Sequence, residues 1–432
     1  MKSKRTAVLM FFVAALGTAA LAQAQGLPTA TPESVGMSAP RLAQISTAFK
    51  QEIDKGNLPG VVMLVARKGR LVYSEALGYL DKEAGKPMSK DAIFRIYSMT
   101  KPLVSVAAMM LVEDGKIELT DPISKFLPAM KSMQVSVAKA DSEFAKIGYT
   151  LTTAQHEITV QDLLRHTAGL AYANLTQNGP VKEAYAKAGV DDDPRGLTPA
   201  EEVERMSKAP LAHEPGTVWE YSLASDMLGR VVEAASGKRL SEFLAERLFK
   251  PLAMNDTAFF VPSDKLNRLA EALPVDASTG KPNKLYNVTA VPNNDSGGAG
   301  GVSTAADYLR FAQMMANGGQ LDGKRYLSRT TVEFMTSDHL GTRISAPVTP
   351  GEILLASAGY TFGLGFAVRQ AAGIAGVPGS AGEFMWGGYA GTYFWIDPKE
   401  QLVAVYMTQA PSPIRAYYRK LFKQLVYAAI VD

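Results

Sequence analysis

The most informative stretch of the sequence is Arg95-Ile96-Tyr97-Ser98-Met99-Thr100-Lys101, which runs into an apolar segment over residues 102–111. The segment predicts a buried helix, and the i,i+3 spacing would place Lys101 one turn above Ser98. A serine hydroxyl becomes a strong nucleophile when a neighbouring base takes its proton, and a buried lysine can be that base. A Ser-x-x-Lys string is common, however, and by itself it more often marks a helix cap beside a solvated lysine.

Two further strings change this interpretation. The first is Trp219-Glu220-Tyr221-Ser222-Leu223, where a strand-like segment turns into an apolar helix. The second is Trp386-Gly387-Gly388-Tyr389, which lies immediately before the last pair of predicted strands. Because glycines lack side chains, we expect them to let a substrate backbone approach this strand edge closely. Three such strings in one chain favour a catalytic site over a helix cap.

Both ends of the chain predict paired strands. Apolar runs at residues 61–66 and 71–73 flank a short turn that contains Gly69. A second pair of runs, at residues 392–396 and 402–406, flanks a turn that contains Pro398. Short apolar runs around such turns are typical of antiparallel hairpins. The two hairpins would build one antiparallel sheet from the two termini.

Helical spacing of apolar residues precedes the first hairpin, over residues 38–54, and follows the second, over residues 414–430. We therefore expect an α/β (α+β) fold whose antiparallel sheet is flanked by helices and carries a mostly helical inserted domain. The expected sheet domain comprises 25–95 and 325–432, and the expected helical domain comprises 96–324. Small-molecule sites often form in the cleft between two such domains, and we expect the active site there.

The three strings, in this order and at these separations, resemble the serine β-lactamase/penicillin-binding superfamily. Strings at residues 163–170, 214–216 and 297–304 look like the same group. The likeness extends over about residues 30–430 and implies the β-lactamase-like fold. Within this superfamily, the sequence is most similar to the family VIII carboxylesterases, which resemble class C β-lactamases.

The resemblance implies a role for each matching residue. Ser98 would be the nucleophile that forms an acyl-enzyme, Lys101 its base partner, and Tyr221 a second group in the proton transfers. The backbone N–H groups of Ser98 and Tyr389 would form the oxyanion hole. The residues that would bind substrate are Leu223, Trp386, Gly387 and Gly388.

Two departures from the class C pattern distinguish the possible substrates. Leu223 stands where that pattern has asparagine, and Trp386 begins the string where the pattern has lysine. Losing the lysine weakens recognition of a carboxylate, a charge-assisted contact of roughly 1.5–3 kcal/mol, whereas an indole offers a flat apolar surface. We therefore expect a carboxylesterase for small or short-chain esters. The alternatives are a β-lactamase or D-alanyl-D-alanine peptidase, hydrolysis of amides or lactones, and a catalytically silent cell-wall binding protein.

The N-terminus predicts export. Lys2, Lys4 and Arg5 precede an apolar run and Ala22-Gln23-Ala24, the order of a signal peptide cut after residue 24. The run is short for a membrane anchor, so we expect a periplasmic or secreted protein without a stable membrane anchor. Loss of the three cations leaves equal numbers of basic and acidic residues in a chain without cysteine. This balance gives no indication of a nucleic-acid partner.

Other strings in the sequence are less informative about function. Asp295-Ser296-Gly297 looks like the serine site of chymotrypsin-like proteases, but the helical middle of the chain argues against that fold, and we expect a tight loop near the cleft. The four histidines lack metal-ligand spacing, and we expect neither a metal nor a cofactor. Tyr172, Tyr185 and Trp219 would line the acyl site or belong to the core. Residues 129–158 predict a surface insertion near the cleft.

Overall fold

A computed structural model describes residues 26–141, 146–190 and 193–432. The expected signal peptide, 1–24, lies outside the described residues. Of the helices in the described ranges, none has the length and apolar character needed to cross a membrane.

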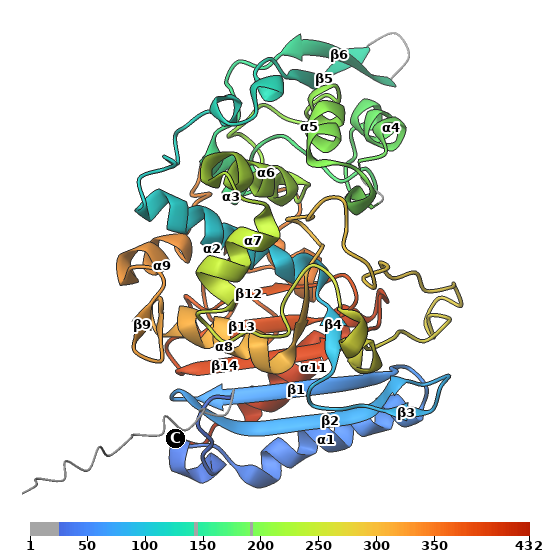
Figure 1. Cartoon of the computed structure of the whole chain (residues 1–432), viewed down its shortest axis with the longest axis vertical. Helices are drawn as coiled ribbons and strands as arrows, with labels where there is room; N and C mark the ends of the chain where they lie inside the picture. Colours follow the sequence, from blue (N-terminus) through green and yellow to red (C-terminus); the bar gives the residue numbers. More distant parts are fainter. Residues whose placement is uncertain (1–25, 142–145, 191–192) are drawn as a thin grey trace, which may run out of the picture.

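The main sheet has eight strands in the order β10-β11-β12-β13-β14-β1-β2-β3, and every neighbouring pair is antiparallel (Figure 1). Strand β1 pairs with β14, so that Val61 lies opposite Thr408 and Arg67 opposite Leu402. The two termini of the chain therefore build one sheet, and the predicted fold class is confirmed. The strands are β1 Gly60–Arg67, β2 Arg70–Asp81, β3 Lys86–Pro87, β10 Tyr360–Phe362, β11 Ala367–Arg369, β12 Phe384–Gly387, β13 Tyr393–Asp397 and β14 Leu402–Thr408.

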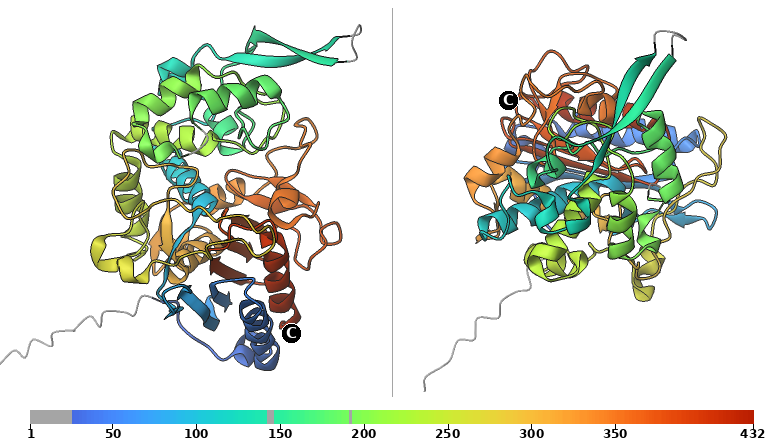
Figure 2. Two further views of the ribbon diagram at one scale, coloured as in Figure 1. Left: turned by 90° about the vertical axis from the view of Figure 1, so that its right-hand side faces the viewer. Right: turned by 90° about the horizontal axis from the view of Figure 1, so that it is seen from above.

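Helices cover both faces of this sheet. Helices α1 (Ala39–Asp54) and α11 (Arg415–Ala428) pack side by side on one face, and α8 (Ala305–Ala316) packs on the other (Figure 2). Successive strand residues point to opposite faces. On β13, accordingly, Trp395 contacts Phe422 of α11 and Phe394 contacts Tyr308 of α8, with ring centroids 5.4 and 4.9 Å apart. Burial on both faces explains why the central strands are apolar throughout.

The predicted terminal elements are confirmed. Helix α1 begins after Ser38, whose hydroxyl accepts a hydrogen bond from the Arg41 N–H, a typical N-cap. The β1–β2 hairpin turns at Lys68 and Gly69, which both have positive φ (53° and 73°), as a two-residue turn of this kind requires.

Along the chain, a mostly helical region separates the strands β1–β3 from the strands β10–β14. Helix α2 is buried over residues 100–111, which explains its apolar character on all sides. Helix α8 lies within the range 96–324 yet packs against β13, β14 and β1 of the sheet. The helices of the region are α2 Thr100–Glu113, α3 Val160–Leu164, α4 Gly179–Ala188, α5 Pro199–Ser207, α6 Ala224–Ser236 and α7 Leu240–Leu244.

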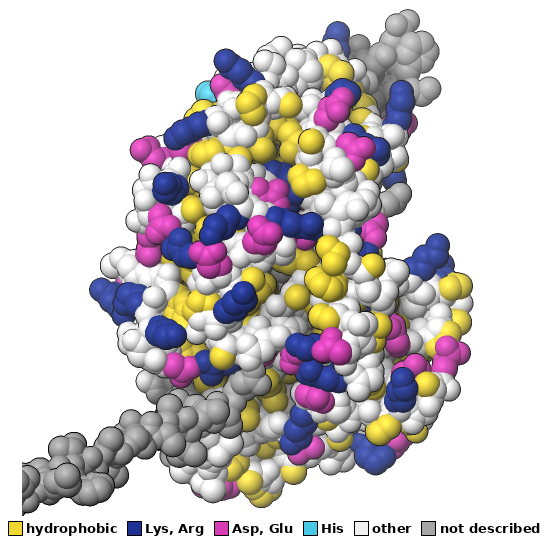
Figure 3. Space-filling view, viewed as in Figure 1, with side chains coloured by type: hydrophobic (Ala, Val, Ile, Leu, Met, Phe, Trp, Pro, Cys, Tyr) yellow, Lys and Arg dark blue, Asp and Glu magenta, His cyan; other side chains and the backbone are white. Residues whose placement is uncertain are grey.

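Shorter elements complete the chain. Strands β5 and β6 form a hairpin that projects from the end of the molecule farthest from the sheet (Figure 1). The face shown in Figure 3 carries basic and acidic side chains intermixed over its surface. The remaining elements are β4 Ile93–Arg95, β5 Gln134–Asp141, β6 Lys146–Thr153, β7 Val302–Thr304, β8 Gln320–Leu321, β9 Lys324–Arg325, α9 Arg329–Met335 and α10 Pro350–Leu355.

Candidate active site

Ser98 lies at the junction between a strand and a buried helix. It belongs to the 3-10 turn η2 (Tyr97–Met99), which follows β4 and leads directly into α2. The side-chain amide of Gln409 bonds to both backbone groups of Arg95 in β4. The Arg95 N–H donates to Gln409 Oε1 at 3.3 Å, and Gln409 Nε2 donates to the Arg95 carbonyl at 3.1 Å. Tyr97 has φ 44°, a conformation that costs free energy in a bulky residue. The chain therefore makes a sharp, well-anchored turn at Ser98.

Lys101 lies one helical turn after Ser98, as the spacing predicted. Its Nζ lies 3.4 Å from Ser98 Oγ, and it also donates to Tyr172 OH at 3.0 Å and to the Gly298 carbonyl at 2.9 Å. The side chain is 1% exposed. Among the residues that the structure describes, no carboxylate forms an ion pair with it. The Lys101 nitrogen is thus surrounded by neutral oxygens, one of which belongs to the candidate nucleophile.

Tyr221 approaches Ser98 from the segment before α6. Its hydroxyl donates to Ser98 Oγ at 2.6 Å, and its ring lies 4.7 Å from Lys101 Nζ. The ring also packs against those of Tyr172 and Trp386, at centroid distances of 5.2 and 5.3 Å. The structure therefore brings together the hydroxyl of Ser98, the amine of Lys101 and the phenol of Tyr221, the three groups that the resemblance implied.

His166 supports Tyr221 from behind. It is 2% exposed, and its ring lies 5.2 Å from that of Tyr221. Its Nδ1 lies 3.1 Å from Ser222 Oγ. Burial, together with the charge of Lys101, holds the pKa of His166 well below its usual range. A neutral, buried imidazole fixed in this way packs against the site without supplying a charge.

Trp386, Gly387 and Gly388 all line the cavity at the end of β12, and the two glycines also pack tightly against the protein's own chain. A Cβ on Gly388 would lie 2.3 Å from the Ile96 carbonyl oxygen, and one on Gly387 would lie 2.9 Å from Arg419 Cζ. The missing side chains make room for the protein's own chain. They bring the end of β12 against the turn that carries Ser98.

This close approach places the second expected oxyanion donor. Tyr389 follows Gly388, and its ring lies 5.4 Å from that of Tyr97, the neighbour of Ser98. Within the described residues, the N–H groups of Ser98 and Tyr389 donate to no other backbone carbonyl. Both N–H groups are available for a substrate oxygen.

The site opens into a cavity of about 830 Å³ lined by Ser98, Tyr172, Tyr221, Trp386, Tyr389 and Arg415, among others. Leu223, which we expected to bind substrate, is not among the residues that line it: Leu223 is 3% exposed and lies in the core at the N-cap position of α6. None of the β5–β6 hairpin residues that the structure describes lines the cavity either. Of the aromatic residues left undecided by sequence, Tyr172 lines the cavity, whereas Tyr185 and Trp219 are buried in the core.

Sequence reasoning named Tyr172 and the string that contains Gly298 but missed their contacts with Lys101, and it missed Arg415 altogether. Tyr172 and the Gly298 carbonyl hold Lys101, and Arg415 adds a cation to the cavity wall. Gly298 lies in the loop that looks like a protease site, where Ser296 Oγ donates to Asp226 at 2.6 Å. The loop thus holds Lys101 in place, and its Ser296 is buried with its hydroxyl bonded to Asp226 and to the Ala299 N–H. The contacts of Lys101 with Tyr172 and Gly298 join distant segments, and no local pattern signals them.

No group of three or more His, Asp or Glu side chains arranged as metal ligands occurs in the described ranges. A Ser–Lys–Tyr site at the start of a buried helix, between an antiparallel sheet and a helical region, defines the class of β-lactamase-fold serine hydrolases. A sequence model of the Beta-lactamase family matches residues 45–427, and the chain belongs to that family.

Two relatives and one solved structure illustrate the similarity. Protein Rv1367c of Mycobacterium tuberculosis (strain ATCC 25618 / H37Rv) is 34% identical over 84% of this chain and 88% of its own. Esterase EstB of Burkholderia gladioli is 32% identical over 85% of this chain and 90% of its own. The structure of EstCE1, a hydrolase with promiscuous acyltransferase activity, is 28% identical and superposes with a TM-score of 0.72, covering 90% of this chain and 99% of its own.

Proposed function

We propose that this protein is a carboxylesterase that cleaves small or short-chain esters through an acyl-enzyme on Ser98. One observation carries the proposal: Ser98 Oγ, on a cavity wall, lies 2.6 Å from Tyr221 OH and 3.4 Å from Lys101 Nζ. A hydroxyl held between two groups able to exchange its proton is the arrangement that nucleophilic catalysis needs. The similarity to esterase EstB supports ester substrates.

The reaction follows from these positions. Ser98 Oγ attacks the ester carbonyl carbon while its proton passes to the Lys101–Tyr221 pair, which accepts it in the form that has one proton fewer than an ammonium beside a phenol. The N–H groups of Ser98 and Tyr389 bind the oxygen that becomes negative. The pair then returns the proton to the leaving alkoxide, which departs as the alcohol and leaves Ser98 acylated. Water attacks the acyl-enzyme, releases the carboxylic acid and restores the Ser98 hydroxyl.

Trp386 supports an uncharged substrate. Trp386 is 1% exposed and is one of the residues that line the cavity. Its indole packs against the rings of Tyr221 and Phe362, with each centroid distance 5.3 Å. It stands where the class C pattern has a lysine. An apolar ring at this point favours a hydrocarbon group and offers no ion pair to a carboxylate.

A second candidate function, hydrolysis of β-lactams or cell-wall peptides, is favoured by one observation. Arg415 lines the same cavity, and its guanidinium donates to the Ser412 carbonyl at 3.0 Å. Within the described residues no carboxylate pairs with it, and burial lowers the pKa of Arg415. A guanidinium in this position is able to bind the carboxylate that every penicillin carries.

One experiment separates the two functions. The purified protein without residues 1–24 is assayed with p-nitrophenyl butyrate and with a chromogenic cephalosporin, using Ser98→Ala as the inactive control. A kcat/KM at least about a hundredfold higher on the ester supports the esterase, and the reverse preference refutes it. Slow-released labelling by a fluorescent penicillin would indicate the peptidase. A protein that turns over neither substrate and takes no fluorophosphonate label on Ser98 would refute both functions in favour of a binding role.

Lys101→Ala tests the proton transfers. We expect it to lose nearly all turnover while remaining folded, because Ser98 then lacks its neighbouring amine. A folded Lys101→Ala protein with near-normal kcat refutes this role.

We also propose that the protein acts in the periplasm or outside the cell. The basic, apolar and small-residue order of residues 1–24 supports export.

A further inference from the structure

Arg419 is a buried cation that the mechanism above does not use. It is 2% exposed on helix α11, and no carboxylate in the described part of the chain pairs with it. Burial lowers the pKa of Arg419 to about 9. Burying a charge without a counter-ion costs free energy, so its contacts need an explanation. The guanidinium donates to three backbone carbonyls, those of Leu354 (3.1 Å), Gly388 (2.5 Å) and Thr392 (3.1 Å).

Two of these carbonyls bracket the turn that contains Tyr389. The Gly388 N–H donates to the Thr392 carbonyl at 2.8 Å, and the Gly391 N–H donates to the Gly388 carbonyl at 3.1 Å. Arg419 Nη2 bonds to both carbonyls and so ties the two ends of the turn together. The Gly388 carbonyl belongs to the same peptide group as the Tyr389 N–H. In a trans peptide these two groups point in opposite directions, so the contact turns the N–H away from Arg419.

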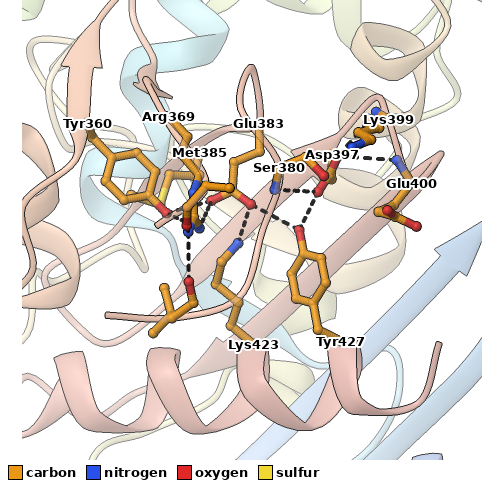
Figure 4. Close-up of polar contacts among 12 residues, drawn as sticks. Tyr360, Arg369, Ser380, Glu383, Met385, Asp397, Lys399, Glu400, Lys423 and Tyr427 are labelled. Atoms are coloured by element: carbon orange, nitrogen blue, oxygen red, sulfur yellow. Dashed lines mark hydrogen bonds and ion pairs between the residues drawn. The ribbon is translucent and has the colours of Figure 1, made fainter. Parts of the chain in front are cut away.

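The surrounding structure is shaped to hold Arg419 there. Gly387 has no side chain, and a Cβ at that position would lie 2.9 Å from both Cζ and Nη2 of Arg419. Farther along α11, Lys423 and Tyr427 both donate to the Glu383 carboxylate, at 2.8 and 2.9 Å (Figure 4). Glu383 immediately precedes β12, so this buried cluster anchors α11 beside the strand that leads to the turn.

We propose that Arg419 is a positioning residue of the oxyanion hole, which orients and polarises the Gly388–Tyr389 peptide so that the Tyr389 N–H donates more strongly to the tetrahedral intermediate. A charged donor on a peptide carbonyl polarises the whole amide and strengthens its N–H as a donor. The positive charge also lies on the side of the peptide opposite the developing oxyanion, where it stabilises negative charge in a low-dielectric site. The proposal rests on the acyl-enzyme mechanism on Ser98.

The test compares Arg419→Gln and Arg419→Lys with Lys420→Gln, which removes the neighbouring cation of α11. Steady-state kinetics on p-nitrophenyl butyrate give kcat and KM, and an alkyl boronic acid, which forms a tetrahedral adduct with the serine, reports oxyanion binding. Loss of one oxyanion donor costs about 10²–10³-fold in kcat, and a weakened donor costs less. We expect Arg419→Gln to lower kcat by roughly 10–100-fold with KM within about twofold. Boronic-acid affinity should fall in parallel, and Arg419→Lys should recover part of both.

Two results would overturn the proposal. One is an Arg419→Gln protein whose kcat and boronic-acid affinity stay within about threefold of wild type. The other is an Arg419→Gln protein whose kcat falls only in proportion to its lowered melting temperature, while its boronic-acid affinity is unchanged. Should Arg419→Gln not fold, Gly387→Ala displaces the guanidinium and keeps its charge. The same kcat-specific loss is expected, and an unchanged kcat would overturn the proposal. Ser98→Ala distinguishes a failure of the Arg419 proposal from a failure of the acyl-enzyme mechanism on which it rests. Activity remaining in Ser98→Ala would refute the mechanism itself.

Discussion

Replacing Gly388 by alanine tests the close approach on which the site depends. The added Cβ would lie 2.3 Å from the Ile96 carbonyl oxygen and 2.2 Å from Thr392 Oγ1, whereas ordinary contact begins near 3.4 Å. The backbone must therefore move by roughly 1 Å. The movement separates Ser98, two residues after Ile96, from the N–H of Tyr389.

The expected loss follows from that displacement. A misplacement of about 1 Å costs roughly 10²-fold in rate, which corresponds to about 2.7 kcal/mol of transition-state stabilisation. The loss should fall on kcat more than on KM, because the oxyanion contact strengthens only in the transition state. Overpacking should also lower the free energy of unfolding by about 1–3 kcal/mol.

The assay measures kcat and KM on p-nitrophenyl butyrate, with thermal unfolding to show that the variant is folded. Gly373→Ala is the matched control, since a Cβ there meets nothing within 4 Å and its backbone is not in the left-handed region. The control should behave like wild type. A folded Gly388→Ala protein with kcat/KM within threefold of wild type would show that the tight packing does not set the catalytic geometry.

Three further predictions concern other parts of the chain. Tyr172→Phe removes an oxygen that accepts from Lys101 at 3.0 Å, so kcat should fall about tenfold, the effect of roughly 1.4 kcal/mol, and an unchanged kcat would contradict that contact's role. Burial, and secondarily the charge of Asp226, raises the pKa of Glu202 from 4.5 to about 7, so the folded state binds more protons than the unfolded state between these values. Stability should therefore decrease as pH rises from 4.5 to 7. Urea unfolding at pH 5 and pH 7.5 measures the free energy of unfolding at both values. Between them, the decrease in Glu202→Gln should be smaller than in wild type by up to about 3 kcal/mol. An equal decrease in the two proteins would refute the protonated carboxyl. Mass spectrometry of the exported protein should find Gln25 as the first residue, and an intact N-terminus would refute cleavage after residue 24.

The sequence predicted best what depends on short separations along the chain. Lys101 reaches Ser98 because residues three apart on a helix are neighbours, and the terminal hairpins form where apolar runs flank a short turn. Strands β10 and β11 have three residues each and were not predicted. Such short segments carry no recognisable alternation, and they exist only because β12 supplies an edge on which to pair.

Contacts between distant segments were predicted only in part. The pairing of Tyr221 with Ser98 spans 123 residues and was implied by the resemblance rather than by any local pattern. Leu223 was expected to bind substrate because it stands where the class C pattern has asparagine, yet its side chain is buried in the core at the start of α6. The glycines of the third string were correctly identified as a close approach, but the approaching group is the chain itself.

The sequence by itself therefore determined the class of fold, the Ser–x–x–Lys pair and the matching motifs, because periodicity, turn chemistry and helical spacing act over a few residues. Only the tertiary structure decided what surrounds them. The carbonyl of Gly298, the phenol of Tyr172 and the guanidinium of Arg419 come from segments far apart in the chain. Each reaches the site because the sheet and the buried helix α2 bring those segments together, and the free energy of that packing is a sum over the whole core, which no short stretch of sequence contains.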